Sequence, residues 1–68
     1  MNKKRPNVMY ALIRYDKNNQ REVYYYDRAA DALNDYEDCV KNGYVYVAVN
    51  RLNRDYTEDT LQYYEKEI

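Results

Sequence analysis

Histidine, phenylalanine and tryptophan are absent from this sequence of 68 residues, and cysteine, glycine and proline occur once each. Without histidine the chain lacks the most frequent general base and a common metal ligand. One glycine is too few for a glycine-rich loop that holds phosphate groups. The single cysteine, Cys39, cannot form an internal disulfide, and with scattered carboxylates it does not make a zinc site. The sequence therefore predicts no catalytic residue, no cofactor and no metal ion, and we expect the protein not to be an enzyme.

The length of the chain predicts one small domain over residues 1–68, with a flexible, basic N-terminal segment at residues 1–7. Domains of this size bury only about 60% of their unfolded surface, so many depend on a disulfide, a metal or oligomerisation. With the first two lacking, self-association or a partner remains. The longest apolar run, residues 8–13, is too short to cross a membrane. A lone reduced cysteine suits the cytoplasm, where we expect this protein to be located.

Tyrosine is the abundant residue, with 11 occurrences in 68 positions. Its ring buries a large apolar area while its hydroxyl seeks a hydrogen-bond partner, so tyrosine suits partly hydrated surfaces and interfaces. The net charge is −1, but residues 1–28 carry a balance of +4 and residues 29–68 a balance of −5. This asymmetry favours orientation on a charged partner or head-to-tail self-contact, and solvated surfaces of different sign are the alternative interpretation.

The first half of the chain predicts a β-hairpin followed by a helix. Residues 8–15 form a continuous apolar run typical of a strand buried on both faces. Asp and Asn at 16–19 favour a turn, and residues 21–26 give a second strand. Residues 27–42 change to the helical period, with Asp27 placed to cap the N-terminus and Gly43 suited to the left-handed position after the C-terminus.

The second half predicts a third strand and a short helix. Residues 44–50 alternate, with the valines on one side and tyrosines on the other. From Thr57, a capping residue with acids in the first turn predicts a C-terminal helix whose stripe is Leu61, Tyr64 and Ile68. We therefore expect an α+β domain in the order ββαβ(α). Its three-stranded antiparallel sheet has the strand order 2-1-3, and one main amphipathic helix crosses one face.

A short turn at 16–19 predicts the pairing of odd positions in the first strand with even positions in the second. One face then carries Met9, Ala11, Ile13, Tyr15, Tyr24 and Tyr26, and the other carries Val8, Tyr10, Leu12, Val23 and Tyr25. A register slip of one residue would exchange these partners. In either register both faces are apolar or aromatic, and the main helix can cover only one.

The uncovered face is the predicted functional surface. It would be closed by the C-terminal segment in a compact monomer, or it would contact a second copy or another protein. The candidate interface residues are five tyrosines and the acids of the outward helix face: Tyr10, Tyr24, Tyr26, Tyr44, Tyr46, Asp31, Asp35 and Asp38. The sequence thus predicts a protein-binding module that also self-associates.

In composition and element order the chain resembles the small orphan proteins of bacteriophages, which include anti-CRISPR proteins. Tyr24-Tyr25-Tyr26 and Tyr44-Val45-Tyr46-Val47 are the stretches most characteristic of this resemblance. The resemblance implies a non-enzymatic inhibitor that binds and occludes a host defence protein in the host cytoplasm. From the uncovered face we expect it to act as a homodimer or in a complex with another protein.

A small single-stranded nucleic-acid-binding protein is the alternative, because aromatic side chains on an open sheet can stack bases. The slight net negative charge and the missing glycine-and-aromatic signature of RNA-recognition sheets favour the protein-binding hypothesis instead.

Overall fold

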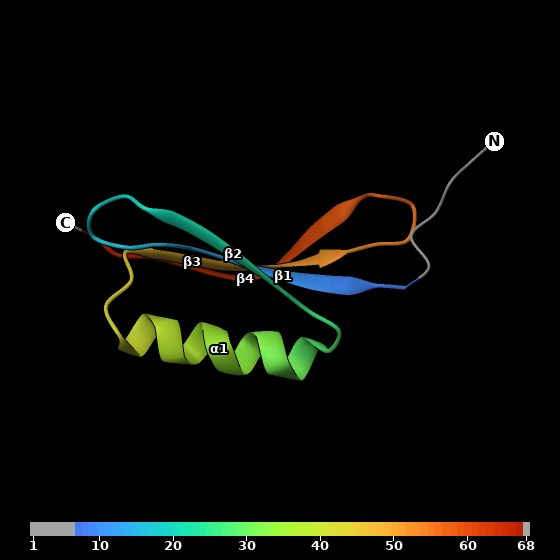
Figure 1. Cartoon of the computed structure of the whole chain (residues 1–68), viewed down its shortest axis with the longest axis horizontal. Helices are drawn as coiled ribbons and strands as arrows, with labels where there is room; N and C mark the ends of the chain where they lie inside the picture. The colour runs from blue at the N-terminus through green and yellow to red at the C-terminus, as the bar shows by residue number, and fades with distance from the viewer. Residues whose placement is uncertain (1–6, 68) are drawn as a thin grey trace.

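A computed structural model describes residues 7–67, so all but Asn7 of the predicted flexible segment lies outside the described residues. The described chain folds in the order ββαββ (Figure 1). Its elements are β1 (Met9–Tyr15), β2 (Arg21–Tyr26), α1 (Ala29–Lys41), β3 (Tyr46–Leu52) and β4 (Glu58–Glu65). The small α+β class is as predicted, but the second helix is not present in this part of the chain.

The four strands form one sheet in the order β2-β1-β3-β4, with antiparallel neighbours throughout. The order of the first three strands agrees with the prediction, because β1 has the most apolar sequence and lies inside the sheet. The predicted C-terminal helix is wrong. Residues Glu58–Glu65 add a fourth strand at the edge beside β3 instead of folding over the sheet.

A β-bulge explains why the sequence of β4 does not show the alternating pattern of a strand. Val49 pairs with Gln62 and Asn50 pairs with Thr60, so Leu61 is an extra residue that interrupts the alternation of a strand. Thr57 does not cap a helix: its hydroxyl lies 2.6 Å and its backbone nitrogen 3.1 Å from Oδ1 of Asp55. These contacts stabilise the turn between β3 and β4. An isolated short helix would be marginal in water, whereas a strand here gains a full ladder of hydrogen bonds.

The β1–β2 turn has one residue more than predicted, and this shifts the register. Tyr15 pairs with Arg21, which leaves residues 16–20 in the loop. Oδ1 of Asp16 accepts hydrogen bonds from the backbone N–H groups of Asn18 and Gln20, at 2.8 and 3.0 Å, and Asn19 is left-handed with φ 65°. Odd positions therefore pair with odd ones, and the predicted distribution of residues over the two faces is wrong.

The sequence correctly predicts the C-terminal end of α1 but not its N-terminal cap. The N-cap is Arg28, which makes no side-chain capping bond, so the prediction that Asp27 caps the helix is wrong. At the other end Gly43 has φ 89°, as predicted. The N–H of Gly43 donates to the carbonyl of Val40 and the N–H of Tyr44 to that of Cys39, at 3.4 and 3.3 Å. This pair of bonds ends the helix and turns the chain back toward the sheet.

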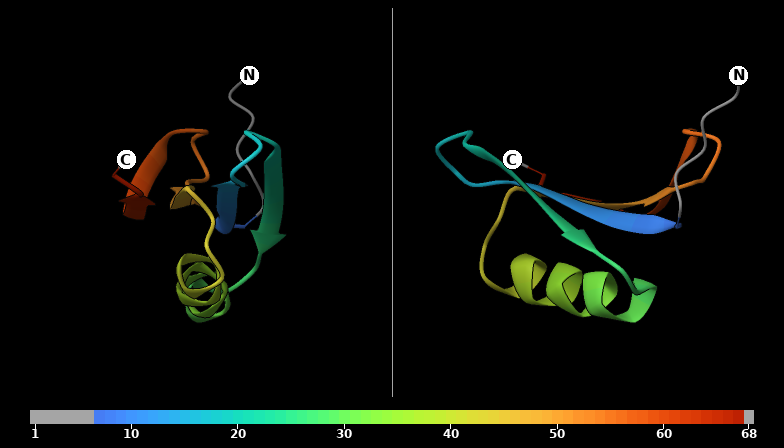
Figure 2. Two further views of the ribbon diagram at one scale, coloured as in Figure 1. Left: turned by 90° about the vertical axis from the view of Figure 1, so that its left-hand side faces the viewer. Right: turned by 45° about the vertical axis from the view of Figure 1, so that its right-hand side comes forward.

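The hydrophobic core lies between α1 and one face of the sheet, chiefly over β1 and β3 (Figure 2). Its fully buried members come from both layers: Leu12, Ala32, Cys39, Val47 and Val49. The valines of β3 face the helix as predicted. No helix among residues 7–67 is both long and apolar enough to span a membrane.

We predict that Leu12→Ala lowers the free energy of unfolding by about 3 kcal/mol, because it opens a cavity at the centre of the core. Urea denaturation followed by circular dichroism would measure this loss. The matched control is Leu61→Ala, which removes the same atoms from a side chain that is 43% exposed and should cost under about 1 kcal/mol. Equal losses in the two variants would contradict the assignment of the core.

Candidate functional site

The face of the sheet that points away from α1, called the open face below, is built from alternate residues of all four strands. Side chains alternate across a sheet, so residues between the core positions Leu12, Val47 and Val49 point to this side. Strand pairing arranges them in four rows across the sheet. In the order β2, β1, β3, β4 the first three rows are Arg21, Tyr15, Tyr46 and Glu65; Val23, Ile13, Ala48 and Tyr63; and Tyr25, Ala11, Asn50 and Thr60. The fourth row lies beyond the end of β2 and has Met9, Leu52 and Glu58 on β1, β3 and β4.

The most exposed tyrosines of the open face lie on its two edge strands, and small side chains lie between them. Tyr25 on β2 is 63% exposed and Tyr63 on β4 is 64% exposed. Their cross-strand neighbours are Ala11 and Ala48, which are only 3% exposed beside these larger side chains. Figure 2 shows no element of the described chain over this face. The face therefore offers two accessible aromatic side chains on either side of a shallow apolar centre.

A hollow of about 520 Å³ extends over the first of these rows and toward the β1–β2 turn. Tyr15 and Tyr46 form its aromatic part, with ring centroids 5.8 Å apart in an edge-to-face arrangement. Arg21, Glu65 and Lys66 also line it. Within residues 7–67 the side chains of Arg21 and Glu65 form no hydrogen bond or ion pair, so both charges are available to an external group.

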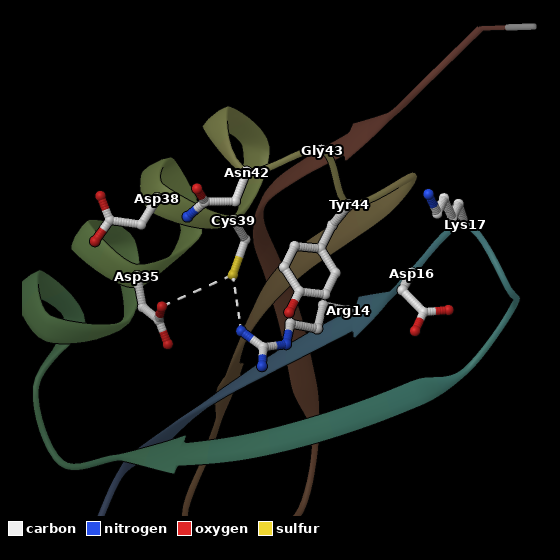
Figure 3. Close-up of a pocket in the computed structure, with 9 residues that line it drawn as sticks. All are labelled: Arg14, Asp16, Lys17, Asp35, Asp38, Cys39, Asn42, Gly43 and Tyr44. Atoms are coloured by element: carbon white, nitrogen blue, oxygen red, sulfur yellow. Dashed lines mark hydrogen bonds between the residues drawn. The ribbon is translucent and has the colours of Figure 1, made fainter.

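The helix side of the sheet carries a polar cluster centred on Arg14 (Figure 3). Nε of Arg14 donates to Glu22 at 3.1 Å, Nη2 donates to the Tyr24 hydroxyl at 3.1 Å, and Nη1 lies 3.3 Å from Sγ of Cys39. The guanidinium carbon also lies 4.7 Å from the centroid of the Tyr24 ring and 4.4 Å from that of Tyr44. Arg14 is thus held by a carboxylate, a hydroxyl, a thiol and two aromatic rings.

The pKa shifts in this cluster indicate that it stabilises the fold and does not activate a nucleophile. Partial burial acts to lower the pKa of Arg14, but its hydrogen bonds to Cys39 and Glu22 outweigh that effect and raise it. Burial raises the pKa of the Cys39 thiol, and the opposing hydrogen bond from Arg14 does not reverse this. Cys39 is therefore a neutral thiol at neutral pH, and it contacts Oδ1 of Asp35 at 3.7 Å. A neutral, buried thiol is a poor nucleophile.

A cleft of about 590 Å³ lies beside the cluster, between the C-terminal end of α1 and the β1–β2 turn. Figure 3 shows Asp16 and Lys17 on its turn side and Asp38 and Asn42 on its helix side. Arg14 lines this cleft but directs nitrogens to three partners within the chain. Among residues 7–67 no group of three Cys, Asp or Glu side chains is arranged to hold a metal ion. The cleft therefore presents solvated charges of both signs.

The structure separates the tyrosines that the sequence grouped together. Tyr10, Tyr26 and Tyr44 are half-buried and pack against the core on the α1 side. Tyr24 lies on the same side beside Arg14, and Tyr46 alone is on the open face. The open-face tyrosines that the sequence did not select are Tyr15, Tyr25 and Tyr63. The correct hairpin register would have placed Tyr25 on the face that carries Tyr15, and recognition of β4 as a strand would have placed Tyr63 there.

The predicted acidic face of α1 is also only partly present. Asp31 and Asp38 are exposed, but Asp35 is half-buried against the sheet. Its Oδ2 accepts a hydrogen bond from the Tyr26 hydroxyl. That hydrogen bond, together with burial, raises the pKa of Tyr26 from its ordinary value of 10.0 to about 12. Asp35 therefore joins helix to sheet, and its placement on the outward helix face is corrected.

Comparisons with known proteins give no relative for this chain. No family model matches it, and neither the curated proteins nor the solved structures contain a significant match. The function therefore has to be argued from the geometry of the described residues.

We predict that the Tyr26–Asp35 hydrogen bond stabilises the fold at neutral pH and is lost in alkali. A folded-state pKa above the unfolded value means that the protonated hydroxyl is favoured by folding. The stabilisation is complete below pH 10.0 and disappears as the pH rises through about 12. Tyr26→Phe should cost about 1–2 kcal/mol at neutral pH and should flatten this alkaline decline. Urea unfolding across that range tests it, with the exposed Tyr25→Phe as the control.

We predict that Cys39 reacts at least about tenfold more slowly with a thiol reagent in the folded protein than in urea, because it is 2% exposed and its pKa is raised. Spectrophotometric assay with an aromatic disulfide measures both rates. Equal rates would show that the thiol is accessible and that the core at α1 opens readily.

Proposed function

We propose that this chain is a non-enzymatic protein-binding module and that the open face of its sheet is the contact surface. The observation that carries the proposal is the pair of exposed tyrosines, Tyr25 and Tyr63, on an apolar face that no described element covers. Exposed apolar patches on small proteins commonly mark contact sites, and tyrosines in such patches contribute strongly to binding.

The dimensions of the open face suit a small interface. Four strands about 4.8 Å apart and seven residues of about 3.3 Å each give roughly 19 by 23 Å. This footprint falls at the low end of specific protein interfaces. The sheet supplies it with little loss of conformational entropy, because the backbone is already fixed by its ladders and a tyrosine has few rotatable bonds.

Binding by occlusion is the mode of action that fits this surface. The polar cluster at Arg14 and Cys39 stabilises the fold and offers no ionised nucleophile, so the domain would act on a target by occupying part of its surface. The resemblance to phage proteins then supports an inhibitor of a host defence protein as the biological role.

The charges of the open face give less support to nucleic-acid binding. Its charged side chains are Arg21 and Lys66 against Glu58 and Glu65, so the charges of the face balance and it has no excess of cations. Binding to a phosphate backbone depends on clustered cations and weakens with salt. Salt-dependent retention on single-stranded DNA would favour this alternative.

We predict that Tyr25→Ser and Tyr63→Ser each weaken association with a target or with a second copy by about tenfold or more, while shifting the melting temperature by only a few degrees. Affinity would be measured by sedimentation velocity for self-association and by surface plasmon resonance for a captured target.

Tyr24→Ser is the matched control on the helix side. Tyr24 is 38% exposed but contacts Arg14, so its loss should lower the melting temperature and leave association unchanged. Wild-type association in both open-face variants would overturn the proposed function.

A further inference from the structure

We propose that a second copy of this chain occupies the open face, related to the first by a two-fold axis that runs parallel to the strands between β1 and β3. This inference rests on the proposed function, since it uses the same face, and it adds the partner and its orientation. A two-fold interface requires a surface that is complementary to itself. The open face meets this requirement in charge, in side-chain size and in curvature.

The symmetry fixes which residues meet. Rotation about an axis along the strands places β1 over β3 of the second copy, and β2 over β4 of the second copy. It moves nothing along the strand direction, so each cross-strand row lies over the same row of the second copy. The register of the sheet therefore determines which residues face each other.

The charges pair in the row nearest the β1–β2 turn. Arg21 on β2 and Glu65 on β4 stand at opposite ends of this row, with Tyr15 and Tyr46 between them. Three strand spacings separate the two side chains within one chain, which is about 14 Å and too far for an ion pair. In the dimer Arg21 faces Glu65 of the second copy, and symmetry repeats this pair.

Side-chain sizes are complementary in the next two rows. Tyr63 faces Val23 of the second copy, and Ile13 faces Ala48 of the second copy. One row further along, Tyr25 faces Thr60 of the second copy. In these two rows each large side chain thus meets a smaller one, which is how facing sheets interdigitate, while in the row nearest the β1–β2 turn Tyr15 faces Tyr46 of the second copy. Side chains of the opposite sheet pack over Ala11 and Ala48 and displace water from them.

The twist of the sheet keeps the two surfaces parallel. The β1–β2 and β3–β4 turns lie at diagonally opposite corners of the sheet, and both rise on the side away from α1 (Figures 1 and 2). The other two corners fall back toward the helix side. The proposed rotation places each rising corner over a receding corner of the second copy, so the gap stays even, as in aligned sheet packing.

The competing two-fold axis, perpendicular to the strands, is disfavoured by charge. It would place Glu65 over Glu58 of the second copy, and symmetry would repeat this repulsion. In the proposed arrangement Glu58 lies over the end of β2 of the second copy. Asp27 and Arg28 at that position carry opposite charges, so Glu58 meets no net charge.

Charge reversal at two positions tests the arrangement. Sedimentation equilibrium of the wild type up to about 200 µM should give a mass approaching twice 8.4 kDa, because a face of this size supports association at micromolar concentrations. Arg21→Glu and Glu65→Arg, taken singly, place like charges at both symmetric pairs. Each should raise the dimer dissociation constant at least about tenfold.

Mixing the two single variants provides the decisive measurement. In the mixed dimer the acid introduced at position 21 faces the base introduced at position 65, and the two unchanged residues pair as before. The mixture should therefore dimerise within about threefold of the wild type, although neither variant does so alone. The controls are Lys41→Glu and Glu37→Arg on the exposed side of α1, which make equal charge changes and should leave dimerisation unchanged.

The outcomes separate this inference from the proposed function. A wild type that stays monomeric at about 200 µM overturns the inference, while the open face could still bind another protein. A dimer that the single reversals leave intact, or that mixing fails to restore, overturns the orientation. In that case, loss of the dimer in Tyr63→Ser would still support the open face as the contact surface. Weakening by each single variant together with recovery in the mixture supports the proposal.

Discussion

The structure depends on one constraint: the inner strand of the sheet is apolar on both faces, and residues 7–67 provide one helix with which to cover them. Leu12 of β1 points into the core beneath α1, while Ala11 and Ile13 on the same strand point away from it. The C-terminal residues could have formed the second covering layer. They extend the sheet as β4 instead, which widens the sheet and leaves the face away from α1 open.

The helix side is secured by polar contacts as well as by its small core. Asp35 and Cys39 lie one turn apart on α1, and they reach Tyr26 on β2 and Arg14 on β1. Arg14 in turn holds Glu22 and Tyr24 at the edge of the sheet. These bonds explain how a helix with few large apolar residues keeps a fixed position over the strands. The same bonds occupy the acidic, thiol and tyrosine side chains that would otherwise be the candidates for a catalytic role.

The sequence predicts the elements whose pattern is regular and misses those that depend on one inserted residue. The 3.6-residue period of α1, the left-handed Gly43 and the order of the first three strands follow from local composition. The loop at Asp16 contains one residue more than a minimal turn, because the Asp16 carboxylate holds two backbone N–H groups and Asn19 adopts a positive φ. That residue exchanges the two faces of β2.

A single inserted residue also limits the prediction of the candidate site. The sequence pattern places Tyr25 on a face with Leu12 and Tyr63 in a helix, so it does not select the two most exposed open-face tyrosines. The existence of an uncovered aromatic face could be predicted from composition and from the number of helices. Its members could not, because side-chain direction in a sheet reverses with every single-residue shift in register.

The bulge at Leu61 has a consequence for how far such a protein can assemble. An edge strand with regular spacing offers its free N–H and C=O groups to another chain, and repeated pairing of that kind gives fibres. In β4 the extra residue breaks this spacing midway, and Glu58, Asp59 and Glu65 place negative charge along the strand. Growth through this edge is thereby obstructed, whereas the proposed two-fold contact through the sheet face would close after two copies. The irregularity that obscured β4 in the sequence therefore also protects this edge of the sheet against repeated strand pairing.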